Sequence, residues 1–121
     1  MSYKLFLEVR TMHVFPEWFE KFKQVTLWPG MDMPVISGHN GQIGFGYVVQ
    51  ETEVPEHAHD GQWGVVLEGE VEFWIGGQYQ AFKKGDYYHI PAGVPHKAKL
   101  HAGTAFIDVW EGQRFSQDQM K

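Results

Sequence analysis

Short apolar runs that alternate with polar residues dominate the chain from about residue 44 onward. Successive side chains of a strand point to opposite faces of a sheet, so this period of two predicts β-strands. Gly and Pro residues separate the runs, and Gly76-Gly77 is typical of a hairpin turn. Strands that recur about every 8–12 residues are typical of an all-β sandwich or barrel. We expect them at 44–50, 64–67, 71–75, 78–82, 87–90, 97–101 and 104–111, with another at 4–9.

One passage near the N-terminus favours a short helix instead. Pro16 suits a first helical position, acidic residues follow in the first turn, and an apolar stripe is formed by Trp18, Phe19 and Phe22. Residues 31–41 contain Pro, Gly and Asn and are predicted to form a loop. The polar end from Gln113 to Lys121 is predicted to fray.

A length of 121 residues, with 43% apolar and 16% aromatic residues, predicts one packed domain rather than a disordered chain. We divide it into an N-terminal arm and helix (1–40), a barrel core (41–114) and a tail (115–121). The aromatic residues of the arm have three possible uses: to cover an edge strand, to cap the barrel or to exchange with a partner subunit.

The charge and the absence of cysteine exclude several classes of function. Ten basic and 15 acidic residues give a net charge of −5, without a Lys/Arg run, which argues against nucleic acid and anionic membranes as partners. Zero cysteines exclude disulfides, thiolate metal sites and a cysteine nucleophile. The N-terminus is too polar for a signal peptide, and no apolar run approaches the ~18 residues of a membrane span. A cytoplasmic location is therefore expected.

Three of the seven histidines have a spacing that can build a metal site. His57 and His59 are two residues apart and would face the same side of a strand. Gln62 follows three residues later, and His96 begins a later strand after a proline. Three imidazoles and one amide oxygen suit a divalent first-row transition metal with one or two open positions. The alternative is that these are ordinary polar residues beside a turn.

Two motifs that contain these histidines resemble those of the cupin superfamily. The first runs from His57-Ala58-His59 through Gln62 to Gly69, and the second runs from Gly85 through Pro91-Ala92-Gly93 to His96. The similarity spans about 44–114; the gap before Gln62 is one residue shorter than usual, and Gln replaces the commoner Glu. The resemblance implies a jelly-roll barrel, a homodimer, and one divalent ion (Mn, Fe, Co, Ni, Cu or Zn) bound by His57, His59, Gln62 and His96.

The neutral Gln in place of Glu affects the expected chemistry. Three imidazoles and an amide leave the full +2 charge on the ion, which favours Lewis-acid activation of a hydroxyl, carbonyl or carboxylate. The same charge makes electron loss harder, which disfavours an oxygenase.

The last strand leaves the position of Asp108 open. Thr104, Phe106, Asp108 and Trp110 alternate with Ala105, Ile107 and Val109, and either set could face the interior. If the first set does, Asp108 lies in an apolar cavity and is a candidate proton shuttle. If the second set forms the core, Asp108 is solvated.

The chain after the second motif also resembles small cupins of uronate catabolism, which linearise unsaturated sugar acids. Their Asp-x-Phe-x-x-x-Arg pattern corresponds to Asp108, Trp110 in place of the Phe, and Arg114. The resemblance implies that Asp108 is the acid/base, Trp110 a wall that stacks on the sugar ring, and Arg114 an anchor for a carboxylate. Phe45 and Tyr47 are expected at the barrel mouth as substrate contacts, with core packing as the alternative.

Three functions follow from this reading. The first is a metal-dependent isomerase or lyase for a small polar sugar acid. The second is a non-catalytic cupin module that binds a small molecule or a metal. The third is a metal-dependent dioxygenase.

Overall fold

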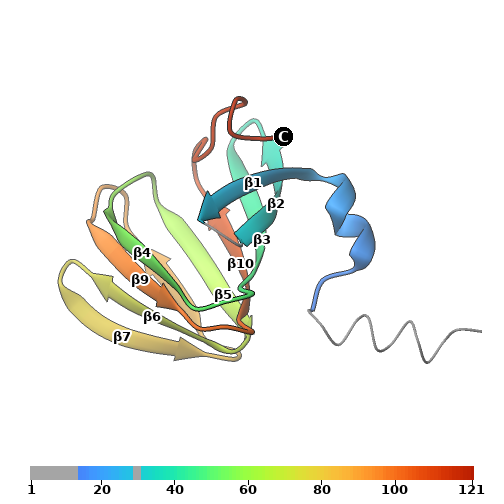
Figure 1. The fold of residues 1–121 in the computed structure, drawn as a ribbon. Helices are drawn as coiled ribbons and strands as arrows, with labels where there is room; N and C mark the ends of the chain where they lie inside the picture. Colours follow the sequence, from blue (N-terminus) through green and yellow to red (C-terminus); the bar gives the residue numbers. More distant parts are fainter. Residues whose placement is uncertain (1–13, 29–30) are drawn as a thin grey trace, which may run out of the picture.

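The structure is a computed structural model that describes residues 14–28 and 31–121 (Figure 1). Within these described residues, ten strands form two antiparallel sheets, which confirms the predicted all-β class. The expected strand at 4–9 lies outside the described residues. β1, β2 and β4 are additional to the expected strands. The strands are β1 (Lys23–Trp28), β2 (Met31–Gly38), β3 (Gly41–Tyr47), β4 (Thr52–His57), β5 (Gln62–Glu68), β6 (Glu70–Ile75), β7 (Gln78–Lys83), β8 (Tyr87–Ile90), β9 (His96–Leu100) and β10 (Ala105–Trp110).

The two sheets enclose the core between them (Figure 1). The six-stranded sheet has the order β1-β2-β3-β10-β5-β8, and the four-stranded sheet has the order β4-β9-β6-β7. Adjacent strands such as β3 and β10 are far apart in the sequence, so the six-stranded sheet depends on hydrogen bonding between distant segments of the chain. Val66 and Phe106 enter the core from the first sheet, and Val71 and Phe73 enter it from the second.

The predicted loop at 31–41 is wrong, because most of it is strand β2. Met31, Met33 and Val35 are buried and alternate with the more exposed Asp32 and Pro34. A Pro and an Asp within the run are typical of turns, but the apolar period of two prevails because its inward face completes the core. The six-stranded sheet therefore begins at β1, within the predicted N-terminal arm.

The predicted helix is present as a single 3-10 segment, Glu17–Lys21. The Phe19 amide donates to the Pro16 carbonyl at 3.0 Å, which is the i to i+3 bonding of a tight turn. Phe22 is already extended, and Lys23 pairs with Val35 in the sheet. The start of β1 thus ends the segment before an α-helix can form. No described helix is long and apolar enough to cross a membrane.

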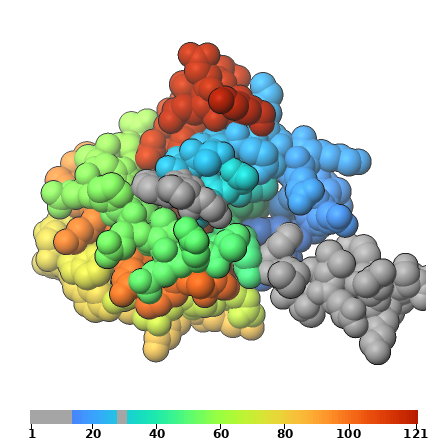
Figure 2. All heavy atoms as spheres, in the orientation of Figure 1, coloured from blue at the N-terminus to red at the C-terminus, as the bar shows by residue number. Residues whose placement is uncertain are grey.

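The C-terminal segment is packed rather than frayed, so that expectation is wrong. Phe115 and Met120 are buried. The Gln42 amide donates to the Phe115 carbonyl at 2.9 Å and accepts from the Phe115 amide at 2.8 Å. Lys121 and Gln24 exchange two backbone hydrogen bonds of 2.9 Å. Figure 2 shows the red C-terminal segment lying against the blue N-terminal part of the chain.

The structure settles which face of β10 points inward: Phe106, Asp108 and Trp110 are buried toward the core. Glycines on both neighbouring strands make room for these side chains. A Cβ at Gly46 would overlap the Phe106 ring, and one at Gly64 would overlap the Asp108 carboxyl group. Asp108 is therefore held inside the barrel, as one of the two alternatives requires.

Candidate metal centre

Two strands of the four-stranded sheet carry His57 and His96, and His59 lies in the loop after the first of them. In β4, Thr52 and Val54 face inward, but the register shifts between Val54 and His57. The shift moves the alternation by one residue, so that His57 rather than Glu56 reaches the interior and lies opposite His96 of β9. His59 follows in the loop, where its carbonyl accepts a hydrogen bond of 2.9 Å from the Gly93 amide. This bond ties the loop to the turn that precedes β9.

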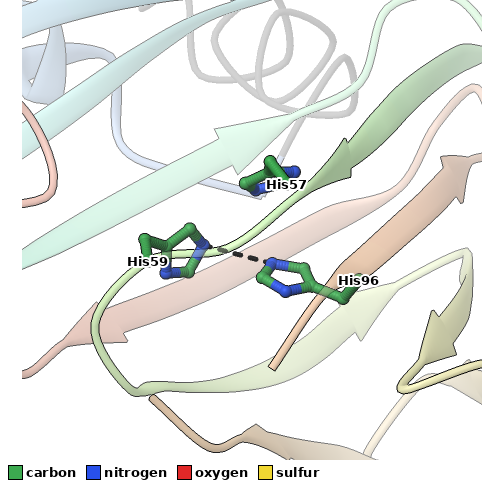
Figure 3. A group of neighbouring side chains, drawn as sticks. All are labelled: His57, His59 and His96. Atoms are coloured by element: carbon green, nitrogen blue, oxygen red, sulfur yellow. Dashed lines mark hydrogen bonds between the residues drawn. The ribbon is translucent and has the colours of Figure 1, made fainter. Parts of the chain in front are cut away.

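The three imidazoles converge on one point (Figure 3). The ring centroids are 4.3 Å apart for His57 and His96, 4.7 Å for His59 and His96, and 5.0 Å for His57 and His59. The Nε2 atoms of His59 and His96 are 3.1 Å apart. One ring nitrogen from each histidine lies within 4.8 Å of the others, which positions the three histidines to bind a metal ion.

Hydrogen bonds to the backbone orient all three rings in the same way. His57 Nδ1 lies 2.9 Å from the Pro55 carbonyl oxygen, and His96 Nδ1 lies 2.9 Å from that of Val94. His59 Nδ1 lies 2.6 Å from the Asp60 carbonyl oxygen. A carbonyl oxygen can only accept, so each Nδ1 carries the proton and each Nε2 keeps a free lone pair. Such bonds fix the tautomer that a metal-binding histidine needs.

The short distance between the Nε2 atoms of His59 and His96 is the one expected for two ligands of the same cation. In these tautomers no proton lies between the Nε2 atoms of His59 and His96, so their lone pairs repel at 3.1 Å. Two ligands about 2.1 Å from one ion and at right angles to each other would be about 3.0 Å apart. The residues therefore fit a single divalent ion.

Two of the three histidines, His59 and His96, are held in the neutral form that binds metals. Burial lowers the pKa of His59 to about 4, with the nearby Arg114 guanidinium contributing in the same direction, against the hydrogen bond to Asp60. Burial also lowers the pKa of His96. At neutral pH these two imidazoles need lose no proton before they bind an ion.

A cavity of about 60 Å³ lies beside the histidines, which is room for a few water-sized groups. Its apolar wall includes Met33, Phe73 and Phe106. Every predicted metal ligand and both predicted catalytic residues line it: His57, His59, Gln62, His96, Asp108 and Arg114. Tyr88 and Trp110 line it as well. The structure thus brings together side chains from β4, β5, β8, β9 and β10.

Gln62 and Tyr88 bracket the Asp108 carboxyl group. The Tyr88 hydroxyl donates to Asp108 Oδ1 at 2.5 Å. Burial raises the pKa of Asp108 to about 7, although hydrogen bonds from Tyr88 and Gln62 act to lower it. Because the Gln62 amide nitrogen is the donor to Asp108, its oxygen stays available for another partner. The Asp108 carboxyl group can therefore hold or release a proton near neutral pH.

Tyr88 is a site residue that the sequence did not indicate. Gly64 pairs with Tyr88 on one side and with Asp108 on the other. A Cβ at Gly64 would overlap both side chains, so this glycine lets the hydroxyl reach the carboxyl group across the sheet. The signal is a glycine in the middle of an apolar strand, and it becomes readable only when the sheet register is known.

Arg114 and Trp110 carry polar groups that the described chain does not satisfy. The half-buried Arg114 guanidinium lies 4.9 Å from the centre of the Phe115 ring, and no described carboxylate pairs with it. Trp110 is only 3% exposed, and its Nε1 is the one buried side-chain polar atom without a partner in 14–28 and 31–121. Phe115 also contacts Trp110, with ring centroids 5.1 Å apart. Phe115 of the packed C-terminal segment thus contacts both side chains, the Arg114 guanidinium and the Trp110 indole.

Phe45 and Tyr47 do not line this cavity. Their role as substrate contacts stays a prediction. The alternation of β3 turns Gly44 and Gly46 inward and therefore Phe45 outward. There its ring meets those of Phe19 and Phe15, with centroids 4.9 and 5.6 Å away. Both residues line a groove on the outer surface.

Comparison with known proteins identifies the family. Residues 50–110, which include all three histidines, match the family model of the cupin domain. The chain belongs to the cupin family. A comparison with curated proteins gives no significant match.

Solved structures share the cupin fold. An RmlC-like cupin from Shewanella frigidimarina is 23% identical, with 88% of this chain and 93% of that chain covered and a TM-score of 0.71. KdgF from Halomonas sp. is 18% identical, with 82% and 92% covered and a TM-score of 0.68. Oxalate decarboxylase from Bacillus subtilis, a protein with Mn(II) centres, is 18% identical, with 81% and 29% covered and a TM-score of 0.67. At these identities the likeness shows the fold alone.

Proposed function

We propose that this cupin is a metal-dependent isomerase or lyase that acts on a small polar sugar acid of the uronate type. One observation carries the proposal. A single cavity is lined by three imidazoles positioned to bind a metal ion, by the Asp108 carboxyl group with its pKa of about 7, and by the Arg114 guanidinium, which has no carboxylate partner among the described residues. Metal, proton donor and anion anchor are the parts that Lewis-acid chemistry on a carboxylated substrate requires.

The ion would be held by His57, His59 and His96, with the Gln62 oxygen as fourth ligand, and it would supply Lewis-acid polarisation of a substrate oxygen. Asp108 would exchange the proton with the substrate, since its pKa of about 7 leaves both forms populated. Tyr88 and Gln62 would hold that carboxyl group in one orientation.

The anionic end of the substrate would bind at Arg114, which lines the same cavity and is close enough to His59 and His96 to lower the pKa of each. The planar guanidinium of Arg114 suits bidentate contact with a carboxylate. The Trp110 indole N–H would donate to a second substrate oxygen, which would satisfy a buried donor that has no partner in the described chain. Burial lowers the pKa of Arg114, but guanidinium remains charged at neutral pH.

The proposal is tested in two steps. Metal content is measured by plasma mass spectrometry on tag-free protein, beside a His57→Ala/His96→Ala control. About one equivalent of a transition metal is expected, and it should be lost in the control. The metal-loaded protein is then offered a panel of unsaturated uronates, and the loss of their ultraviolet absorbance is followed.

The outcomes separate the candidate functions. Turnover that Asp108→Asn abolishes without loss of metal would support the proposal. Metal-replete protein that converts none of the uronates would refute the substrate class. Affinity for a uronate with no product over hours would favour a binding module. Oxygen uptake by an iron-loaded sample would favour a dioxygenase.

A further inference from the structure

Of the three histidines of the candidate metal centre, His59 is the one that lies outside the strands. His57 ends β4 and His96 begins β9, whereas His59 lies in the loop that follows β4 (Figure 3). The backbone of a loop is held less firmly than that of a paired strand. The orientation of the His59 ring therefore needs a support that the sheet does not provide.

One peptide group of this loop joins the His59 ring to a carboxylate. His59 Nδ1 donates to the Asp60 carbonyl oxygen at 2.6 Å. The amide of the same peptide group, that of Gly61, donates to Glu111 Oε1 at 3.0 Å. The C=O and N–H of a trans peptide group point in opposite directions, so the imidazole and the carboxylate bind its two ends. The Glu111 carboxylate is thus linked to His59 through two hydrogen bonds.

The loops that carry these residues interlock. Gly61 is buried, so its N–H needs a partner within the protein, and a Cβ there would lie 2.9 Å from Glu111 Oε1. The Glu111 amide in turn donates to the Gly61 carbonyl at 3.0 Å. The arrangement is repeated in reverse one residue away, where a Cβ at Gly112 would overlap the Asp60 carboxyl group. Each loop therefore places an acidic side chain against a glycine of the other.

The other two histidines lack this arrangement. Their Nδ1 atoms lie 2.9 Å from the carbonyl oxygens that they bind, which is longer than the 2.6 Å at His59. The carbonyl that His96 binds is that of Val94, whose peptide group ends at the nitrogen of Pro95 and has no N–H. A carboxylate bound to one end of a peptide group polarises it and strengthens the acceptor at the other end. The shorter bond at His59 fits this effect.

The charge of Glu111 is available to act on the peptide group. Its carboxylate forms no ion pair with a Lys, Arg or His among the described residues. Hydrogen bonding behind a metal-binding histidine fixes its tautomer and makes its other nitrogen a stronger ligand. We propose that Glu111 is a positioning residue for metal binding, which acts through the Asp60–Gly61 peptide group to hold His59 with its Nε2 lone pair toward the ion. This role rests on the metal binding that the proposed function requires, but not on its substrate.

The first test is the affinity of the full chain for Zn²⁺, measured by competition with a chromophoric chelator. Glu111→Ala should weaken binding about tenfold. Glu111→Gln should weaken it less, because an amide oxygen can still accept from the Gly61 N–H. The matched control is Glu56→Gln, which removes an exposed charge beside His57 and should bind within about twofold of wild type. Equal affinity of wild type and Glu111→Ala, or an equal loss in Glu56→Gln and Glu111→Gln, would overturn the proposal.

The second test reads the histidine tautomers of chelator-treated protein by ¹⁵N nuclear magnetic resonance. Wild type should carry the His59 proton on Nδ1, and Glu111→Ala should shift His59 toward the Nε2–H form while His57 and His96 keep theirs. Gly61→Ala should have the same effect, because its Cβ displaces the flexible carboxyl group of Glu111 and leaves the charge in the chain.

Circular dichroism checks that each variant is folded. An unchanged His59 tautomer in folded Glu111→Ala would overturn the role of Glu111. Wild type that binds no Zn²⁺ would instead refute the proposed function, and the tautomers, which are measured without metal, would still decide whether Glu111 orients His59.

Discussion

Asp108→Asn tests the proton-holding role of the cavity through stability alone. Burial raises the Asp108 pKa from 3.8 to about 7. The folded state therefore binds this proton more tightly than the unfolded state does. Below about pH 4 both states are protonated, so the group costs nothing. As the pH rises from about 4 to about 7, the unfolded state loses the proton first and the folded state is progressively destabilised; above about pH 7 the difference is constant.

The magnitude follows from the shift. A change of about three pKa units corresponds to about 4 kcal/mol in total, and about 3 kcal/mol of it should be lost between pH 5 and pH 8. Asn remains neutral and carries no such loss. The advantage of wild type over Asp108→Asn should therefore shrink, or reverse, by that amount between the two pH values. The lowered pKa of His59 acts with the opposite sign, but it is present in both proteins and cancels.

The assay is urea denaturation of chelator-treated protein at pH 5 and pH 8, since a bound cation would favour the charged carboxylate. The exposed Asp118→Asn serves as the control and should follow the wild-type profile. If wild type and Asp108→Asn show parallel pH dependence, Asp108 is ionised in the folded protein at pH 5. The proton-transfer role proposed for it would then have no basis.

Three further substitutions test the surroundings of the cavity. Gly64→Ala should lower the free energy of unfolding by about 1–3 kcal/mol in urea denaturation, because its Cβ overlaps Asp108 and Tyr88; unchanged stability would refute this packing. Trp110→Phe removes the indole N–H together with part of the ring and should weaken binding of an unsaturated uronate about tenfold by calorimetry. Equal affinity would contradict the role of Nε1. Gln62→Glu should slow metal removal by a chelator, because the fourth ligand becomes anionic, whereas an unchanged rate would argue that Gln62 does not bind the ion.

Local sequence spacing was sufficient for the histidines, and sheet context decided most of what it missed. His57 and His59 are two residues apart, and the turn before His96 is encoded by its own Gly and Pro residues. The orientation of Phe45, the course of β2 and the position of Tyr88 depend instead on pairing between distant strands. Alternation alone defines two faces but not which of them is inside. The roles of Gln62, Asp108 and Arg114 stay predictions.

The glycines of β3 show why the inward face of a strand could be predicted from the sequence only in part. Gly44 and Gly46 could have indicated that β3 turns its empty side toward large side chains, but only the folded structure shows that Met33 and Trp110 lie against Gly44 and Phe106 against Gly46. The same holds for the C-terminal segment. Its Phe115 is one apolar residue in a polar stretch, and it is buried because Gln42, inward on β3, satisfies both of its backbone groups.

The charge balance of the cavity favours an anionic ligand. His59 and His96 are neutral at neutral pH because burial lowers their pKa values, and Gln62 carries no charge. Asp108 carries at most one negative charge, whereas Arg114 and a bound divalent ion would together contribute three positive charges. A buried excess of two or three positive charges is costly unless an anion offsets it. A Glu at position 62 would have removed one of them within the protein. With Gln there, the proposed substrate would supply the compensating charge through a carboxylate bound at Arg114.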